Sequence, residues 1–158
     1  MTQTTVHASQ ENPVQTHRDH EVVVIGAGVA GIYQIKRLID LGVNATVLDA
    51  NEDLGGTWYN NRYPGARFDS ESFTYGYSFS KELLEEWHWN EQFSPQPDTL
   101  RYLNYVADKF DLREHMQFGC KVEAMVFNDE TDTWTIQLAG GREITTHFVI
   151  TAVGVLSM

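Results

Sequence analysis

The chain is poor in cysteine and in positive charge. Among its 158 residues only Cys120 is a cysteine, which excludes an internal disulfide and a metal cluster built from several cysteines. Eleven lysines and arginines stand against 22 aspartates and glutamates, so the formal net charge is −11. Because phosphate backbones and anionic lipids attract clustered cations, we expect no nucleic-acid partner and no membrane partner. The scarcity of cysteine fits a reducing compartment, and we expect a cytoplasmic protein.

The chain also has no long apolar run. No stretch reaches the roughly 18 apolar residues that a membrane helix needs. Residues 1–20 are polar and lack the apolar centre of a secretory signal, so we predict a disordered leader there. The whole chain has 42% hydrophobic and 21% charged residues, which is the composition of a globular protein, and we predict a domain over residues 21–158.

The folded part begins with a strand, a glycine loop and a helix. Residues 21–25 (EVVVI) are a β-branched run, typical of a strand buried on both faces of a parallel sheet. The glycine motif GAGVAG occupies residues 26–31, and residues 32–39 then repeat apolar side chains at helical spacing. Residues 44–48 indicate a second strand. This order predicts a right-handed βαβ unit.

The remaining chain alternates irregular and regular segments. Residues 50–80 are irregular but rich in aromatic residues, which argues for a functional segment rather than disorder. The patterns further on predict a helix over 81–89, a helix capped by Asp98 or Thr99, and strands over 121–127, 133–138, near Ile144 and over 148–156. Because the last predicted strand stands without a following crossover, we expect the chain to be the N-terminal part of a longer protein.

The glycine motif lies where a dinucleotide phosphate would bind. Gly26 permits a tight turn, Gly28 lets the backbone approach a pyrophosphate, and Gly31 allows close packing of helix on strand. The helix N-terminus stabilises phosphate charge, so an acidic protein is able to bind an anionic cofactor. Asp49, 18 positions after Gly31, is predicted to accept hydrogen bonds from ribose hydroxyls and disfavours a 2′-phosphate. The alternative is a glycine turn without a ligand.

A second glycine element, Gly55-Gly56, precedes Thr57, Trp58 and Tyr59. A glycine pair beside an aromatic suits close approach of the backbone to a flat group such as a flavin. The alternative is a plain turn with a packed tryptophan.

Two arginines follow in the same irregular segment. Arg62 and Arg67 stand close to Asp69 and a Pro-Gly turn. Such a cationic spot suits a pyrophosphate or a nicotinamide cofactor. The alternative is an exposed ion pair between Arg67 and Asp69.

No metal site is predicted. The six histidines are scattered without ligand spacing, and three of them lie in residues 1–20. Cys120 has no activating neighbour in the sequence and is expected to be a buried small residue. Trp87, Trp89 and Trp134 are expected to be packing residues rather than a stacking platform for nucleic-acid bases.

Three segments together resemble a known family. GAGVAG (26–31), LDANEDLGGTWYNNRYPGARFDSESFTYGYSFS (48–80) and WHWNEQFSPQPDTLRYLNYVADKFDLR (87–113) closely resemble the N-terminal FAD region of Baeyer–Villiger monooxygenases. The resemblance runs over residues 21–157, and GGTWYNNRYPGARFD is its most specific stretch. It implies an α/β fold: a Rossmann-like FAD-binding domain with a parallel sheet and a small antiparallel β insertion, truncated, with the NADPH domain missing.

The resemblance also implies an activity. Such enzymes use FAD and NADPH to insert one oxygen atom from O2 beside a ketone carbonyl, giving an ester or lactone. Asp69 would be a supporting catalytic residue, placing the nicotinamide and a partner arginine. Carried over residue by residue, the cofactor contacts would be Gly26, Gly28, Gly31, Asp49, Gly55, Gly56, Thr57, Trp58, Tyr59, Asn60, Arg67, Phe68, Asp69, Tyr75 and Val122. The family more often has Glu at the position of Asp49.

Several family features lie outside this chain. The fingerprint F-x-G-x-x-x-H-x-x-x-W-P, a second G-x-G-x-x-G and the active-site arginine do not occur in it. We therefore expect the chain alone to turn over no ketone. The alternatives are a flavin monooxygenase acting on nitrogen or sulfur, a non-catalytic FAD-binding module, and a plain NAD-binding domain, which GGTW disfavours.

Overall fold

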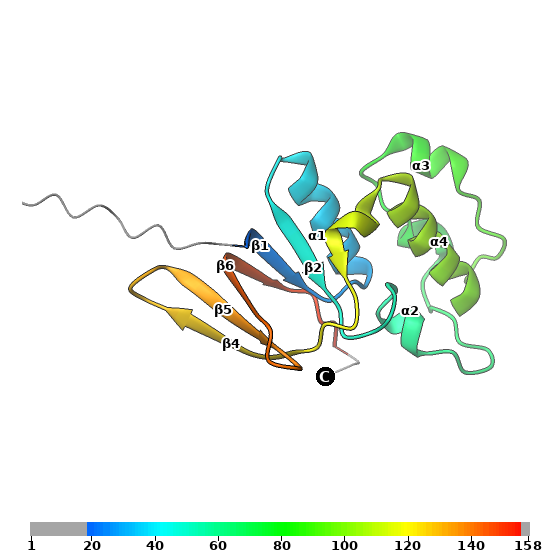
Figure 1. The fold of residues 1–158 in the computed structure, drawn as a ribbon. Coiled ribbons are helices and arrows are strands. Elements are labelled where there is room, and N and C mark those ends of the chain that lie inside the picture. Colours follow the sequence, from blue (N-terminus) through cyan, green and yellow to red (C-terminus); the bar gives the residue numbers. More distant parts are fainter. Residues whose placement is uncertain (1–18, 156–158) are drawn as a thin grey trace, which may run out of the picture.

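The computed structural model describes residues 19–155, built around one mixed sheet (Figure 1). The strand order in that sheet is β3-β2-β1-β6-β5-β4. The strands are β1 (His20–Ile25), β2 (Ala45–Leu48), β3 (Met116–Gln117), β4 (Val122–Asn128), β5 (Thr133–Leu138) and β6 (Glu143–Thr151). The α-helices are α1 (Val29–Asp40), α2 (Thr57–Asn60), α3 (Lys81–Glu86) and α4 (Gln96–Lys109), with 3₁₀ turns at Ser72–Tyr75 and Leu112–His115.

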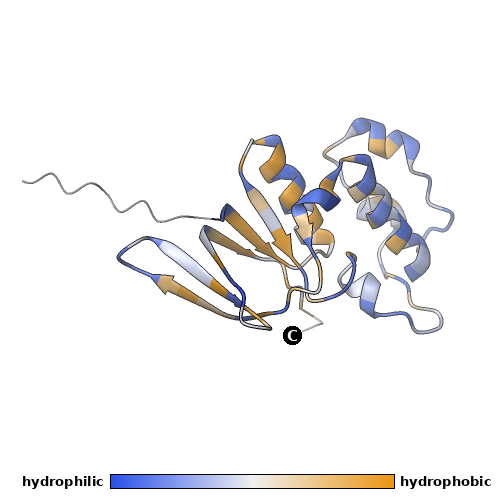
Figure 2. Cartoon of the chain, viewed as in Figure 1, coloured by the Kyte–Doolittle hydropathy of each residue, from blue (hydrophilic) through white to orange (hydrophobic). Residues whose placement is uncertain are grey.

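The predicted βαβ unit is confirmed as β1, α1 and β2. Strand β1 pairs in parallel with both β2 and β6, so it lies between two neighbours. Its Val23 and Val24 are fully buried on opposite faces. Helix α1 covers the face of Val24 with Ile32 and Ile35. In Figure 2, hydrophobic residues (orange) fill the central strands and recur along α1.

The predicted antiparallel insertion is also confirmed, as the ladder of β4, β5 and β6. The prediction of two separate strands near Ile144 and over 148–156 is wrong, because β6 is one continuous strand that ends at Thr151. The polar residues in its middle suggested a break. Thr146 is nevertheless fully buried and pairs with Trp134 of β5 on one side and His20 of β1 on the other.

The helical region, residues 57–110, is inserted between β2 and β3. Helix α3 ends at Glu86, earlier than the predicted 89, and Ser80 caps it by accepting a hydrogen bond from the Leu83 amide at 3.1 Å. The predicted cap of α4 at Asp98 or Thr99 is wrong. The helix already begins at Gln96, with Pro95 as its N-cap and Pro97 in its first turn. Proline is tolerated at these positions because the first backbone N–H groups of a helix have no partner within it.

The predicted leader covers residues 1–20, of which 1–18 lie outside the described residues. His20 already belongs to β1. Within residues 19–155, none of the helices is long and apolar enough to cross a membrane.

Candidate functional site

The glycine loop between β1 and α1 is held by backbone contacts that leave no room for a side chain at Gly26 or Gly31. Gly26 has a φ of +104°, and a Cβ there would lie 2.6 Å from the Ala152 carbonyl oxygen. A Cβ on Gly31 would lie only 1.8 Å from the Gly26 carbonyl oxygen. The positive φ of Gly26 fits the tight turn predicted there, and Gly31 allows the close packing predicted for it, which brings α1 directly onto the loop.

The N-terminus of α1 presents backbone donors to the loop. The first hydrogen bond of the helix runs from the Ile32 amide to the Gly28 carbonyl at 3.0 Å, so the preceding amides have no carbonyl of the helix to bind. No side chain caps this end, and the first turn contains no acidic residue. This arrangement suits an anionic group such as a phosphate.

Asp49 fastens the glycine loop to the end of β2. Its side chain is buried, and Oδ2 accepts a hydrogen bond from the Ala27 amide at 2.6 Å. Oδ1 accepts hydrogen bonds from the amide and the side chain of Asn51, at 2.8 and 2.9 Å. The carboxylate thus has a structural role that the sequence did not indicate, while it also lines the cleft described next. Its contact with ribose stays a prediction.

The second glycine pair packs against the first glycine loop. The Gly55 amide donates to the Ala27 carbonyl at 2.9 Å, and a Cβ on Gly56 would lie 2.9 Å from the Gly28 Cα. The close approach that requires glycine here is therefore between two backbone segments. Gly28 and Gly56 together form a floor without side chains.

A cleft of 790 Å³ lies over this floor. Ten of the fifteen predicted cofactor residues line it: Gly26, Gly28, Asp49, Gly55, Gly56, Thr57, Trp58, Asn60, Tyr75 and Val122. The structure therefore brings together residues from the glycine loop, the end of β2, α2 and the start of β4. The volume lies within the range of small-molecule sites.

The other five predicted residues lie away from the cleft lining. Gly31 is a buried residue of α1, and Tyr59 lies on α2. Phe68 is buried, and its ring stacks on Tyr75 with centroids 4.4 Å apart. Tyr75 in turn accepts a hydrogen bond from Trp58 Nε1 at 2.6 Å. Phe68 thus supports two residues of the cleft from behind.

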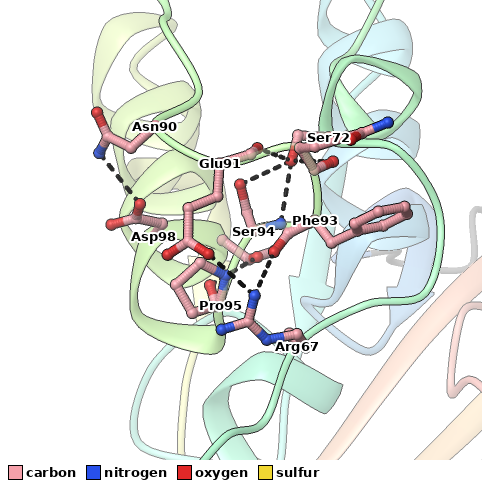
Figure 3. A network of polar contacts seen from close by, with 10 residues as sticks. Arg67, Ser72, Asn90, Glu91, Phe93, Ser94, Pro95 and Asp98 are labelled. Carbon is pink, nitrogen blue, oxygen red and sulfur yellow. Dashed lines mark hydrogen bonds and ion pairs between the residues drawn. The ribbon is translucent and has the colours of Figure 1, made fainter.

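Arg67 is held by partners other than Asp69. Figure 3 shows its guanidinium directed at Glu91, with Nη1 3.0 Å from Glu91 Oε2 and 2.9 Å from the Phe93 carbonyl oxygen. The exposed Arg67–Asp69 pair, weighed as the alternative, is therefore replaced by a pair with Glu91. Arg62 lies over the Tyr59 ring and donates from Nε to the Tyr59 carbonyl at 2.7 Å. The predicted roles of Arg67 and Asp69 stay predictions.

Sequence reasoning missed several residues that line the cleft. Lys121 supplies a positive charge there, next to the predicted Val122. The segment 152–155 forms another wall. Cys120 also lines the cleft and is half-buried, so the expectation of a buried residue is wrong. The Cys120 amide donates to the Asp49 carbonyl at 2.8 Å, which draws this segment beside the end of β2.

The cleft residues fit a dinucleotide and do not form a metal site. The floor without side chains and the uncapped end of α1 leave space and donors for a pyrophosphate. Among residues 19–155 no group of three or more histidine, cysteine, aspartate or glutamate side chains is placed to hold a metal ion.

These features define a nucleotide-binding α/β domain, and comparison with known families agrees. A family model described as an NAD(P)-binding Rossmann-like domain matches residues 24–105. The chain belongs to this family.

The individual relatives are monooxygenases. The chain is 44% identical over 137 residues, 87% of its length, to 2-oxo-Δ3-4,5,5-trimethylcyclopentenylacetyl-CoA monooxygenase of Pseudomonas putida. It is 41% identical, over 93% of its length, to a Baeyer–Villiger monooxygenase of Pseudooceanicola batsensis, and 42% identical, over 90%, to a phenazine N-monooxygenase of Lysobacter antibioticus. The resemblance to Baeyer–Villiger monooxygenases is thereby confirmed.

A solved structure gives the same assignment of the fold. The OTEMO complex with FAD and NADP superposes with a TM-score of 0.83 and 42% identity, over 88% of this chain and 26% of that one. The three relatives above are likewise covered only to 25%, 27% and 26% of their lengths. The chain therefore spans about a quarter of the proteins that it matches.

Proposed function

We propose that this chain is the FAD-binding part of a Baeyer–Villiger monooxygenase that uses FAD and NADPH. The observation that supports this most strongly is the cleft, where ten predicted cofactor residues meet over the Gly28–Gly56 floor. The likeness to Baeyer–Villiger relatives supports the same assignment. In the longer protein the substrate would be a ketone and the co-substrate O2.

The chain's own residues have distinct roles in this proposal. The first turn of α1 binds the pyrophosphate through backbone amides, and Lys121 adds a positive charge at the same cleft. Asp49 holds the glycine loop in place and binds ribose. Trp58 and Tyr75, joined by a hydrogen bond, line the flavin end. When bound, FAD supplies the oxidation chemistry, and these side chains orient it and exclude water.

Binding of FAD is the direct test. The purified chain is mixed with FAD, separated by gel filtration, and examined for retained flavin by absorbance and by fluorescence quenching. We expect flavin to be retained by the chain and lost in Gly28→Ala, whose added methyl group projects onto the floor 3.5 Å from Gly56 Cα. Retention that is equal in both proteins would contradict this placement of the cofactor.

The chain alone is expected to consume no NADPH in response to a ketone. The family fingerprint and the second glycine motif are not among its 158 residues. A ketone-dependent loss of NADPH absorbance with the purified chain would overturn this part of the proposal.

A second candidate is oxidation of nitrogen or sulfur centres. It is favoured by the 42% identity to the phenazine N-monooxygenase, which is similar to the identity with the Baeyer–Villiger relative. Reading the gene beyond the codon for Met158 separates the candidates. Continuation into F-x-G-x-x-x-H-x-x-x-W-P favours ketone oxidation, continuation without it favours nitrogen or sulfur, and a stop codon favours a flavin-binding module.

A further inference from the structure

The cleft is connected to the protein surface by closely spaced aromatic rings. At the cleft, the Trp58 ring lies 5.7 Å from the Phe68 ring, centroid to centroid. Phe68 lies 6.1 Å from Trp89, and Trp89 lies 5.7 Å from Trp87. Trp87 in turn lies 5.4 Å from Tyr105 on α4. No gap in this path exceeds the usual spacing of aromatic pairs.

The path ends on a phenol with a proton acceptor. Tyr105 Oη donates a hydrogen bond to Glu86 Oε2 at 2.6 Å. Lys109 Nζ also lies 2.6 Å from that oxygen. The hydrogen bonds from Lys109 and Tyr105 lower the pKa of Glu86, so the carboxylate is ionised at neutral pH. It lies within the distance required of a base that takes a proton.

Among the described residues, the neighbouring phenols have no carboxylate acceptor. The Tyr75 oxygen, beside Trp58 and Phe68, accepts a hydrogen bond from Trp58 Nε1 at 2.6 Å. Tyr102 is buried and lies 5.1 Å from Trp87, but its oxygen accepts a hydrogen bond from the Tyr77 amide and contacts no carboxylate among the described residues. Tyr77 donates to the Val29 carbonyl. A phenol loses an electron most readily when its proton leaves together with the electron. Tyr105 is therefore the terminus that the chemistry favours.

We propose that this ring series conducts one-electron oxidising equivalents from the cleft to the surface, where they can be reduced without damage to the cofactor site. The ring series is Trp58, Phe68, Trp89, Trp87 and Tyr105. The oxidant considered is a photo-excited oxidised flavin in the cleft, so the inference rests on the proposed function in this one respect. The phenylalanine is a spacer, and the indoles and the phenol are the redox-active groups.

The Trp58 indole would give one electron to the photo-excited flavin, from which O2 later removes it, and Trp58 would be restored by an electron that passes from Trp89 and Trp87. Tyr105 supplies that electron, and its phenolic proton moves to Glu86 Oε2, which leaves a neutral tyrosyl radical beside a protonated carboxyl group. An external reductant such as ascorbate then returns an electron to Tyr105, and the proton returns from Glu86.

The test is a laser-flash experiment on the chain loaded with FAD. Transient absorption and electron paramagnetic resonance are used to detect a tyrosyl radical. We expect a long-lived tyrosyl radical in the unaltered chain, its loss in Tyr105→Phe, and its retention in Trp134→Phe, which removes an indole of β5 outside the ring series. An undiminished tyrosyl signal in Tyr105→Phe, with FAD bound, would overturn the relay and leave the proposed function intact.

A second variant tests whether the loss of signal in Tyr105→Phe is caused only by altered packing of the rings. Glu86→Gln keeps every ring of the series and removes the carboxylate that takes the proton. We expect the tyrosyl signal to fall and a tryptophan radical to replace it. An unchanged tyrosyl yield in this variant would remove Glu86 from the proposal and overturn the assignment of Tyr105 as a proton-coupled terminus.

A flavin-independent measurement keeps the two proposals separable. If the chain does not retain FAD, the proposed function fails, and the relay is tested with a ruthenium polypyridyl photo-oxidant attached to Cys120, which lines the cleft. A tyrosyl radical that depends on Tyr105 then supports the relay. A radical that forms equally in Tyr105→Phe, or no radical at all, contradicts it.

Discussion

Two regions of the molecule meet at the cleft, and they position its residues by different means. In the sheet region (β1, α1, β2 and β6), backbone groups contact one another directly, as where Gly31 lies against the Gly26 carbonyl. In the helical region (57–110), contacts between side chains position the cleft residues, as where Phe68 stacks on Tyr75. Backbone contacts tolerate almost no added atom, whereas stacked rings have neighbours that can adjust. Substitutions in the sheet region should therefore have the larger effects.

The largest expected effect is that of Gly31→Ala. The added Cβ would lie 1.8 Å from the Gly26 carbonyl oxygen, so α1 must move off the loop. We expect destabilisation on the order of 3 kcal/mol or more, measured by urea unfolding followed by circular dichroism. Gly28→Ala is the matched control, because the φ of Gly28 is −81° and the nearest neighbour of the added Cβ, Gly56 Cα, would be 3.5 Å away. A Gly31→Ala protein as stable as Gly28→Ala would contradict the comparison.

Asp49→Ala should have the next largest effect. It removes the acceptor of the buried Ala27 amide and of two Asn51 donors. An unsatisfied buried donor costs roughly 1–3 kcal/mol, so thermal unfolding should shift downward accordingly. The exposed Glu52→Gln serves as the control and should leave the transition unchanged. Equal transitions in both variants would show that the carboxylate is not a structural fastening.

In the helical region, Tyr102→Phe should alter the response to alkali. Burial raises the pKa of Tyr102 to about 12 from 10.0, so between these values the unfolded chain has lost a proton that the folded chain retains. Stability therefore falls as the pH rises from about 10 to 12. In Tyr102→Phe this contribution is absent and the alkaline decline should be shallower. Unfolding of both proteins along a pH series measures the difference, and identical slopes would contradict it.

The smallest effect is expected at Arg67. Its ion pair with Glu91 joins two side chains that are 45% and 50% exposed. Exposed pairs contribute about 0–1 kcal/mol, so Arg67→Ala should leave the unfolding free energy nearly unchanged. A loss as large as that of Asp49→Ala would show that side-chain contacts at the surface of the helical region rival the backbone contacts of the sheet region.

The difference between backbone contacts and side-chain contacts also explains which features could be predicted from the sequence. The strand EVVVI, the glycine loop and α1 follow from local patterns, because their periodicity and their glycines reflect backbone demands. The continuity of β6 does not follow from a local pattern. Thr146 is polar, and it is buried because it lies between two partner strands, β1 and β5. The start of α4 at Gln96 was missed because two prolines suggested a loop.

The candidate site divides in a similar way. The glycines and the aromatic residues of the cleft were found because their types and spacing carry the signal. Lys121 and the 152–155 wall were not, because they reach the cleft only through the sheet register. The fastening role of Asp49 also depends on its position opposite the Ala27 amide, which no spacing rule describes.

The shared strand β6 has a consequence for how this domain tolerates change in length. Its first half follows the register of β5, and its second half follows that of β1. One residue inserted within β6 would turn every following side chain to the opposite face and displace the 152–155 wall. Residues 129–132, at the far tip of the β4–β5 hairpin, lie outside both registers. The tip should therefore tolerate insertions and deletions, and it is also the place to insert a peptide tag.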